Sequence, residues 1–199
     1  MKIAMDIDGP VANFSKAYIN YCNMRFGYDM TLENKDKWNL HKCTGVPIKA
    51  IEDKQAFQEF CDIRMFAALE LVDGAKEGLC ALSGMGHDII YITARPQSAH
   101  RTTAKWLVKK GLPIDGILFR NYDKGKFARH LGCAVAIDDK LENCIDFLRS
   151  GIFTVVWDAL YNKSFIKNTN GTRVYGWRDI VALIGSDTLK EKLTKNILR

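Results

Sequence analysis

Short apolar runs alternate with stretches of helical periodicity along this chain, and the alternation restricts its fold more than any other feature. The helical stretches Gly74–Met85 and Ala99–Lys110 carry apolar residues at three- and four-residue spacing. Runs of four to six residues alternating with such helices are typical of a parallel sheet covered on both faces. We therefore predict an α/β fold. Its expected strands are Lys2–Ile7, Asp88–Thr93, Gly116–Phe119, Cys133–Ile137 and Ile152–Trp157.

The segment between the first two expected strands has a different character. Residues 15–70 contain no convincing strand, mix aromatic and charged residues at helical spacing, and include the breakers Gly27, Gly45 and Pro47. We predict a helical cap at 15–70, inserted into a core formed by residues 1–14 and 71–199. Ligands of open parallel sheets bind beyond the carboxyl ends of the strands, so this insertion would overhang the binding crevice.

The first strand ends in two acids, in the sequence Asp6-Ile7-Asp8-Gly9. Such a pair suits phosphoryl chemistry, in which one carboxylate attacks phosphorus while the other protonates the leaving oxygen and then activates water. Two carboxylates repel a phosphate dianion, and Mg²⁺, which favours oxygen ligands, would remove that repulsion. A simple turn or helix cap is the structural alternative for these residues.

The second expected buried strand ends in a polar loop, Thr93-Ala94-Arg95-Pro96. The Thr93 hydroxyl and the amides that follow it are suited to bind phosphate oxygens near a helix start, and a helix cap is the alternative reading. Further along, Lys124 or Lys126 at the start of a short helix would neutralise charge on a transferring phosphoryl group. Lysines at such positions are more often solvated.

Another buried strand, Cys133–Ile137, ends in the adjacent acids Asp138 and Asp139. Because the carboxyl ends of parallel strands share one edge of the sheet, these acids are expected near Asp6 and Asp8. Asp138 is the expected metal ligand, and capping of the helix Leu141–Arg149 is the alternative role for Asp139.

These residues, taken in chain order, resemble the motifs of the haloacid dehalogenase superfamily of phosphatases. The resemblance implies a Rossmann-like core in which Asp6 is the nucleophile and Asp8 the general acid and base. It further implies that Thr93 binds phosphate and that Lys124 stabilises the transferring group. Magnesium would be held by Asp6, the backbone carbonyl of Asp8, and Asp138. The motifs span most of the chain.

The resemblance also shapes the expected phosphate site. Lys124 is preferred to Lys126 because its separation from Asp138 is closer to the spacing in that superfamily, although Lys126 stays open. Pro10 departs from the Thr or Val common at its position, and it removes one backbone donor beside the phosphate loop. The residues expected to contact the substrate are Gly9, Thr93, Ala94, Arg95 and Lys124.

Other stretches are similar to the 5′(3′)-deoxyribonucleotidase family. They are Met5–Phe14, Leu71–Ala75, the helix around Trp106-Leu107, and Asp158–Asn162 with Trp177 downstream. This resemblance implies a nucleoside monophosphate as the small-molecule substrate and a small helical cap. Aromatic residues of the insertion either stack on a base or form its core. The candidates are Phe14, Tyr18, Trp38 and Phe66.

Two other functions remain open. Arg101–Leu107 and Ile117–Arg120 are also similar to the phosphatase half of polynucleotide end-healing enzymes, whose substrate would be a 3′-phosphate on DNA or RNA. A non-catalytic nucleic-acid-binding protein would use the basic end of the chain, where residues 160–199 hold eight Lys or Arg against three acids. The complete set of acids argues against the binding protein, and a cap would restrict access for a polymer.

The sequence predicts a cytoplasmic protein. The longest apolar runs are too short for a membrane span, and Asp6 and Asp8 interrupt what would be the apolar part of a secretory signal. The six cysteines are scattered, with no Cys-x-x-Cys pair, and are expected to be free thiols. The sequence leaves oligomeric state, base and sugar preference, and the choice between 5′ and 3′ phosphates undecided.

Overall fold

A six-stranded parallel sheet forms the centre of the protein. The computed structural model describes residues 1–62, 65–119, 122–165 and 170–197. The strand order is β3-β2-β1-β4-β5-β6, with every neighbouring pair parallel. The predicted α/β class is confirmed. The strands are β1 Lys2–Met5, β2 Asp88–Thr93, β3 Gly116–Phe119, β4 Cys133–Asp138, β5 Phe153–Trp157 and β6 Gly171–Val174.

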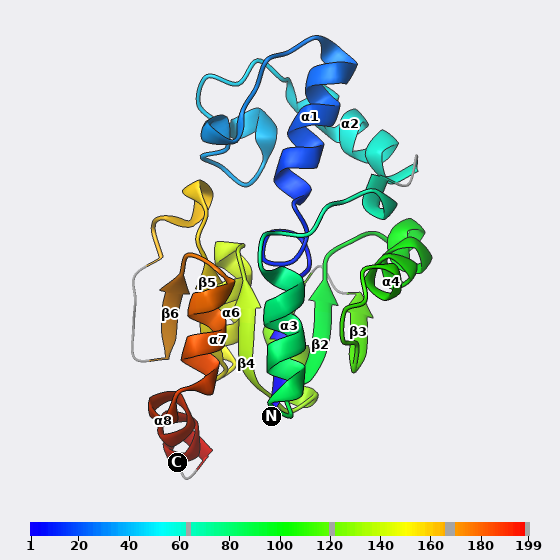
Figure 1. Cartoon of the computed structure of the whole chain (residues 1–199). Helices are drawn as coiled ribbons and strands as arrows, with labels where there is room; N and C mark the ends of the chain where they lie inside the picture. The colour runs from blue at the N-terminus through cyan, green and yellow to red at the C-terminus, as the bar shows by residue number, and fades with distance from the viewer. Residues whose placement is uncertain (63–64, 120–121, 166–169, 198–199) are drawn as a thin grey trace.

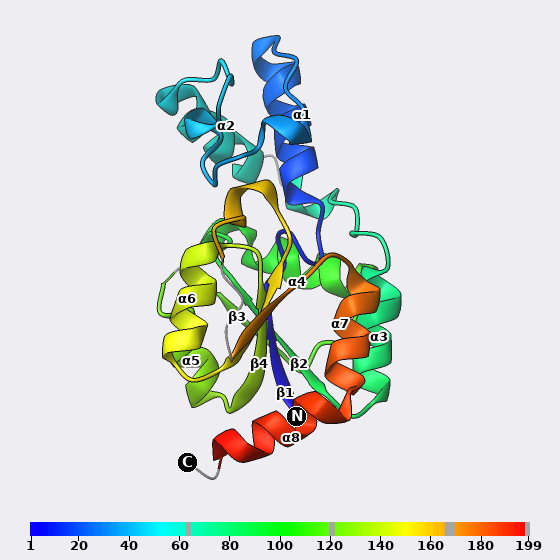
Figure 2. The same cartoon turned by 90° about the vertical axis from the view of Figure 1, so that its left-hand side faces the viewer.

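Helices cover both faces of the sheet (Figures 1 and 2). On one face α3 (Ala75–Gly84) packs beside α7 (Trp177–Gly185), and on the other α5 (Lys124–His130) packs beside α6 (Leu141–Arg149). The helix α4 (His100–Lys109) connects β2 to β3. The helix α8 (Asp187–Ile197) lies across the end of the sheet where β1 begins (Figure 2).

The core is divided by the sheet into two parts because side chains of a strand alternate between its faces. In β1, Ile3 and Met5 join the larger cluster, whereas Ala4 joins the smaller one. The larger cluster also contains Trp106 of α4 and Trp177 of α7. This burial fixes β1 at the centre of the sheet, and with it the position where the chain leaves β1.

The segment between β1 and α3 projects beyond the carboxyl ends of the strands (Figure 1). Its described residues form the helices α1 (Phe14–Phe26) and α2 (Ala50–Asp62) and the 3₁₀ turns Leu32–Asn34, Leu40–Lys42 and Met65–Ala67. The outgoing and returning chains are hydrogen-bonded to each other, since Asn13 N donates to Glu70 O at 3.0 Å and Val72 N to Val11 O at 2.9 Å. The division into a core and a cap at residue 15 and residue 70 stays a prediction.

Several bounds differ from those expected. Strand β1 ends at Met5 and not at Ile7, because the Ile7 carbonyl accepts hydrogen bonds from Val11 N and Ala12 N and the chain turns there. Strand β6 was not predicted, since its Thr172 and Arg173 are half-buried polar residues at the sheet edge. Arg120, Lys167 and Arg199, which belonged to the alternative readings, lie outside the described residues.

The cysteines and the lengths of the apolar helices can also be compared with the sequence predictions. All six cysteines are free, as predicted, and Cys80 alone among them is exposed. Within the described residues, no helix combines the length and the apolar composition that crossing a bilayer requires.

Replacement of Gly78 by Ala is expected to destabilise the protein. A Cβ at Gly78 in α3 would lie 2.2 Å from Cε3 of Trp177, so the two helices would have to move apart. We expect the free energy of unfolding in urea to fall by about 1–3 kcal/mol, as overpacking of a core does. Gly84→Ala is the matched control at the end of the same helix, because no atom lies within 4 Å of its Cβ position. Equal stability of the two variants would contradict the packing described.

Candidate active site

The site lies where β1 and its neighbour β4 end. Asp6 follows β1 directly, and its backbone N–H donates to Ile137 O of β4 at 2.9 Å. Asp138 is the last residue of β4. The parallel register pairs Met5 with Ile137, so the next residue on each strand, Asp6 and Asp138, reaches the same edge. The predicted convergence of these two acids is therefore present in the structure.

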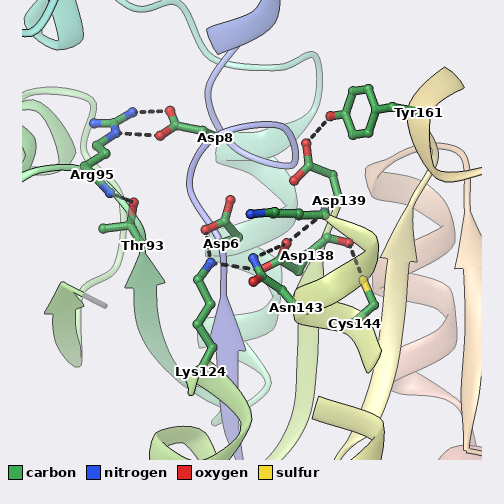
Figure 3. A network of polar contacts seen from close by, with 11 residues as sticks. Asp6, Asp8, Thr93, Arg95, Lys124, Asp138, Asp139, Asn143, Cys144 and Tyr161 are labelled. Carbon is green, nitrogen blue, oxygen red and sulfur yellow. Dashed lines mark hydrogen bonds and ion pairs between the residues drawn. The ribbon is translucent and has the colours of Figure 1, made fainter. Parts of the chain in front are cut away.

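Lys124, the first residue of α5, connects the two acids (Figure 3). Its Nζ donates to Asp6 Oδ1 at 2.6 Å and to Asp138 Oδ2 at 2.9 Å. The Lys124 and Asp138 side chains are 1% exposed and the Asp6 side chain 7%. Lys126 is exposed on the same helix. Of the two lysines left open by the sequence, Lys124 is the one that contacts the acids.

A third carboxylate joins this pair. Ligand atoms of Asp6, Asp138 and Asp139 all lie within 4.8 Å of one another. Asp139 Oδ2 accepts a hydrogen bond from the Tyr161 hydroxyl, whereas Asp139 Oδ1 is buried without a hydrogen-bond partner. A buried carboxylate oxygen without a donor is costly, and a hard cation would satisfy it. The three acids therefore fit a Mg²⁺ ion.

Crowding of these acids shifts their pKa values. Burial raises the pKa of Asp6 to about 7, and the Asp138 and Asp8 carboxylates add to the shift, although Lys124 opposes it. Burial also raises the pKa of Asp139, with Asp138 and Asp6 adding to it. Burial alone would lower the pKa of Lys124, but Asp138 and Asp6 raise it above its ordinary value. The single ammonium group of Lys124 is thus too little positive charge to balance the carboxyl groups of Asp6, Asp138 and Asp139.

Gly9 lets the chain pass close to this cluster. Its φ is +120°, which L side chains rarely adopt, and a Cβ there would lie 2.2 Å from Asp139 Oδ2. The following residue is also fixed, because Pro10 O accepts a hydrogen bond from Trp177 Nε1 at 2.7 Å. The carbonyl of Pro10, the residue that departs from the superfamily pattern, therefore holds the loop after β1 to Trp177 at the start of α7.

Asp8 points away from the cluster, toward Arg95 (Figure 3). The Arg95 guanidinium donates to both Asp8 oxygens, at 2.9 and 2.6 Å, and to Thr103 Oγ1 at 3.1 Å. It lies over the rings of Phe66 and Trp106, with its Cζ 4.5 and 5.4 Å from their centres. Sequence reasoning missed this ion pair, having assigned the Arg95 backbone to a phosphate.

Thr93, at the end of β2, lies beside the same loop. Its side chain is buried, and its Oγ1 accepts from Arg95 N at 3.3 Å. Ala94 is exposed and lines a cleft together with Asp8 and Asp139. The loop after β2 therefore lies at the same cleft as Asp8 and Asp139. The phosphate-binding roles of these residues stay predictions.

Polar residues beyond the expected set hold the acids in place. Asn143 Nδ2 donates to both Asp138 oxygens, at 3.1 and 3.0 Å, and Asn162 Nδ2 donates to Asp139 O at 2.7 Å. Lys140 N, at the start of α6, donates to Asp138 Oδ1 at 2.9 Å. The hydrogen bond at this helix start is thus made by Asp138 and not by Asp139. Asn143 lies in the first turn of α6, five residues after Asp138, and this short separation was the signal in the sequence that could have identified it.

A cleft of about 510 Å³ runs from the carboxyl ends of the strands toward the helical segment that contains α1 and α2. Its lower end is formed by Asp8, Ala94 and Asp139, and its upper end includes His41 and Asp53. The aromatic residues Phe14, Tyr18 and Trp38 line it. Tyr18 is also buried in the hydrophobic core, and stacking of these rings on a base stays a prediction. Phe66 is 1% exposed and packs among aromatic residues of the segment.

A family model described as 5′ nucleotidase, deoxy (pyrimidine), cytosolic type C protein matches residues 1–193. The chain belongs to this family. A nucleotidase from Clostridium acetobutylicum is 27% identical over 193 residues, which cover 96% of each chain. Family membership identifies the protein as a phosphoric monoester hydrolase.

Solved structures of the haloacid dehalogenase superfamily share the fold. A haloacid dehalogenase-like hydrolase from Xanthomonas campestris aligns with a TM-score of 0.64 at 10% identity, covering 98% of both chains. A hydrolase of the same superfamily from Deinococcus radiodurans, solved with bound phosphate and sodium, has a TM-score of 0.64 at 12% identity and covers 94% of this chain and 96% of that one. The superfamily resemblance of the motifs is therefore confirmed at the level of the fold.

The raised pKa of Asp6 makes stability depend on pH. Between the ordinary carboxyl pKa of 3.8 and the raised pKa of about 7, the folded protein holds a proton on Asp6 that the unfolded chain has released, so stability must fall as pH rises through this range. We expect the difference in unfolding free energy between wild type and Asp6→Asn, measured with EDTA in urea, to grow in favour of the variant from pH 4 to pH 7. A constant difference would contradict the raised pKa.

Proposed function

We propose that this enzyme hydrolyses nucleoside monophosphates in a Mg²⁺-dependent reaction through an aspartyl-phosphate on Asp6. The observation that carries the proposal is the pairing of Lys124 with Asp6 and Asp138, with Asp139 beside these acids and one buried Asp139 oxygen left without a donor. Family membership supports the substrate class, and the cytoplasm is the expected location.

The proposed metal site is built from the crowded acids. Asp6, Asp138 and Asp139 supply carboxylate oxygens, and the superfamily resemblance adds the backbone carbonyl of Asp8. When bound, Mg²⁺ supplies positive charge that lets a phosphate dianion approach the acids. Lys124 donates to Asp6 and Asp138 from the side of α5, and it stabilises negative charge that develops on the phosphoryl group.

The first proposed step is attack by an Asp6 carboxylate oxygen on phosphorus. The bond from phosphorus to the leaving oxygen breaks, and that oxygen takes a proton from Asp8. Because Asp8 is paired with Arg95 in the structure, its carboxyl group must leave Arg95 to reach the leaving oxygen. The Thr93 hydroxyl and the amides of Ala94 and Arg95 bind the phosphoryl oxygens during this step.

The second proposed step removes the phosphoryl group from Asp6. Asp8, now a carboxylate, accepts a proton from a water molecule whose oxygen attacks phosphorus. The bond between phosphorus and the Asp6 oxygen breaks, so that inorganic phosphate leaves and Asp6 is regenerated. The absence of a side chain at Gly9 lets the backbone between the two catalytic aspartates pass close to Asp139.

The cleft favours a nucleotide over a polymer end. It is bounded above by α1 and α2 residues such as Phe14, Tyr18 and Phe57, so a substrate has to fit between the helical segment and the strand ends. A volume of about 510 Å³ is within the range usual for small-molecule sites.

Phosphate release from a panel of ribo- and deoxyribonucleoside 5′- and 3′-monophosphates tests the proposal. We expect turnover of mononucleotides with Mg²⁺ and none with EDTA, since the crowded acids repel the substrate without a cation. Asp6→Asn is expected to lose at least about 10³-fold in kcat while keeping its fold, because it removes the nucleophile. A 3′-phosphorylated oligonucleotide in the same panel tests the alternative, a polynucleotide 3′-phosphatase. Hydrolysis of the oligonucleotide without hydrolysis of any mononucleotide would contradict the proposal.

A further inference from the structure

A histidine faces the upper end of the cleft, away from the acids. His41 and Asp53 line the same cleft as Asp8 and Asp139, so a substrate whose phosphate reaches Asp6 extends toward them. The His41 side chain is 24% exposed and the Asp53 side chain 12%. The catalytic steps above use neither residue, and their position at the far end of the cleft calls for a separate explanation.

Asp53 fixes the orientation of His41. Its Oδ2 lies 2.6 Å from His41 Nδ1 and accepts from His41 N at 3.1 Å, while its Oδ1 accepts from the Tyr18 hydroxyl at 2.6 Å. An ionised carboxylate only accepts hydrogen bonds, so the hydrogen between the two side chains belongs to Nδ1. With the proton on Nδ1, the neutral form of the ring has Nε2 as its hydrogen-bond acceptor.

The rest of the upper cleft is suited to a flat ring. The Phe14 and Tyr18 rings are stacked with centres 5.5 Å apart, and Trp38 and Phe57 are each 40% exposed along the same wall. Lys54 and Asn39 also reach this end, but both are exposed and neither is held as His41 is. Lys35 is also held there, but its Nζ donates to the carbonyls of Lys37 and Trp38 and offers no acceptor. His41 is thus a polar group with a fixed direction and an acceptor atom among aromatic walls.

We propose that His41 is a specificity-determining residue whose Nε2 accepts a hydrogen bond from an N–H on the polar edge of a nucleobase. This inference rests on the proposed function and adds to it the group that distinguishes a nucleotide from a sugar phosphate. Asp53 is the positioning residue that keeps the ring in the accepting tautomer. A base without an N–H donor leaves Nε2 desolvated and unpaired, which lowers affinity.

The test compares each of two nucleotides with its N-methylated form. Thymidine 5′-monophosphate loses its base N–H on methylation at N3, and inosine 5′-monophosphate loses its base N–H at N1. For wild type at pH 8 with Mg²⁺, we expect methylation to lower kcat/KM about 10-fold, mainly through KM, as loss of one hydrogen bond does. In His41→Phe this ratio is expected to approach 1.

Deoxyribose 5-phosphate, which has no base, separates recognition from general damage. Its kcat/KM is expected to stay within about 2-fold of wild type in His41→Phe, because the lost contact is to the base. His41→Gln keeps an acceptor and is expected to restore part of the discrimination, and Asp53→Asn is expected to weaken it. His130→Asn, at an exposed position in α5, is the matched control. Thermal melting shows whether each variant is folded.

The outcomes separate this inference from the proposed function. If wild type hydrolyses none of these phosphate esters, the proposed function fails and the inference fails with it. If wild type hydrolyses the nucleotides but accepts the methylated forms equally well, the inference alone is overturned. It is also overturned if His41→Phe, or His41→Gln where the first variant does not fold, lowers hydrolysis of deoxyribose 5-phosphate as much as that of the nucleotides.

Discussion

The pairing of Lys124 with two buried aspartates is the interaction on which the rest of the site depends. Its ammonium group lies 2.6 Å from Asp6 Oδ1 and 2.9 Å from Asp138 Oδ2, in a region from which water is almost excluded. Because Asp139 adds a third carboxylate, the cluster carries more acid than base. Burial of such charge is unfavourable unless it is paired, and the protein holds the acids with Asn143 and Tyr161. One Asp139 oxygen is left without a donor, and we propose that it contacts a cation.

The burial of two central strands offsets the unfavourable free energy of this charged cluster, because the cluster lies at the ends of these strands. β1 and β4 are neighbours at the centre of the sheet, and their apolar residues are almost fully buried on both faces. The stable position of these strands sets where Asp6 and Asp138 emerge. The same edge faces the helical segment, so the chemistry and the residues that contact the rest of a substrate share one cleft.

Much of this site was predictable from the sequence because strand ends determine it. Apolar runs that stop at Asp6, Thr93 and Asp138 identify the sheet edge, since parallel strands end on the same side. The pairing of Asp8 with Arg95 was not predictable, because it depends on the path of two loops and on the rings beneath Arg95. The edge strand β6 was missed because half-buried polar residues give a weak pattern.

The central claim is that Asp6 becomes phosphorylated, and chemical trapping tests it most directly. Enzyme mixed with a nucleoside monophosphate and Mg²⁺, quenched within one turnover, is treated with borohydride, which reduces an acyl phosphate to an alcohol. Peptide mass spectrometry then locates the change. We expect homoserine in place of Asp6, and no homoserine in the Asp6→Asn variant. Modification of another acid, or an unmodified Asp6 in enzyme quenched during active turnover, would contradict it.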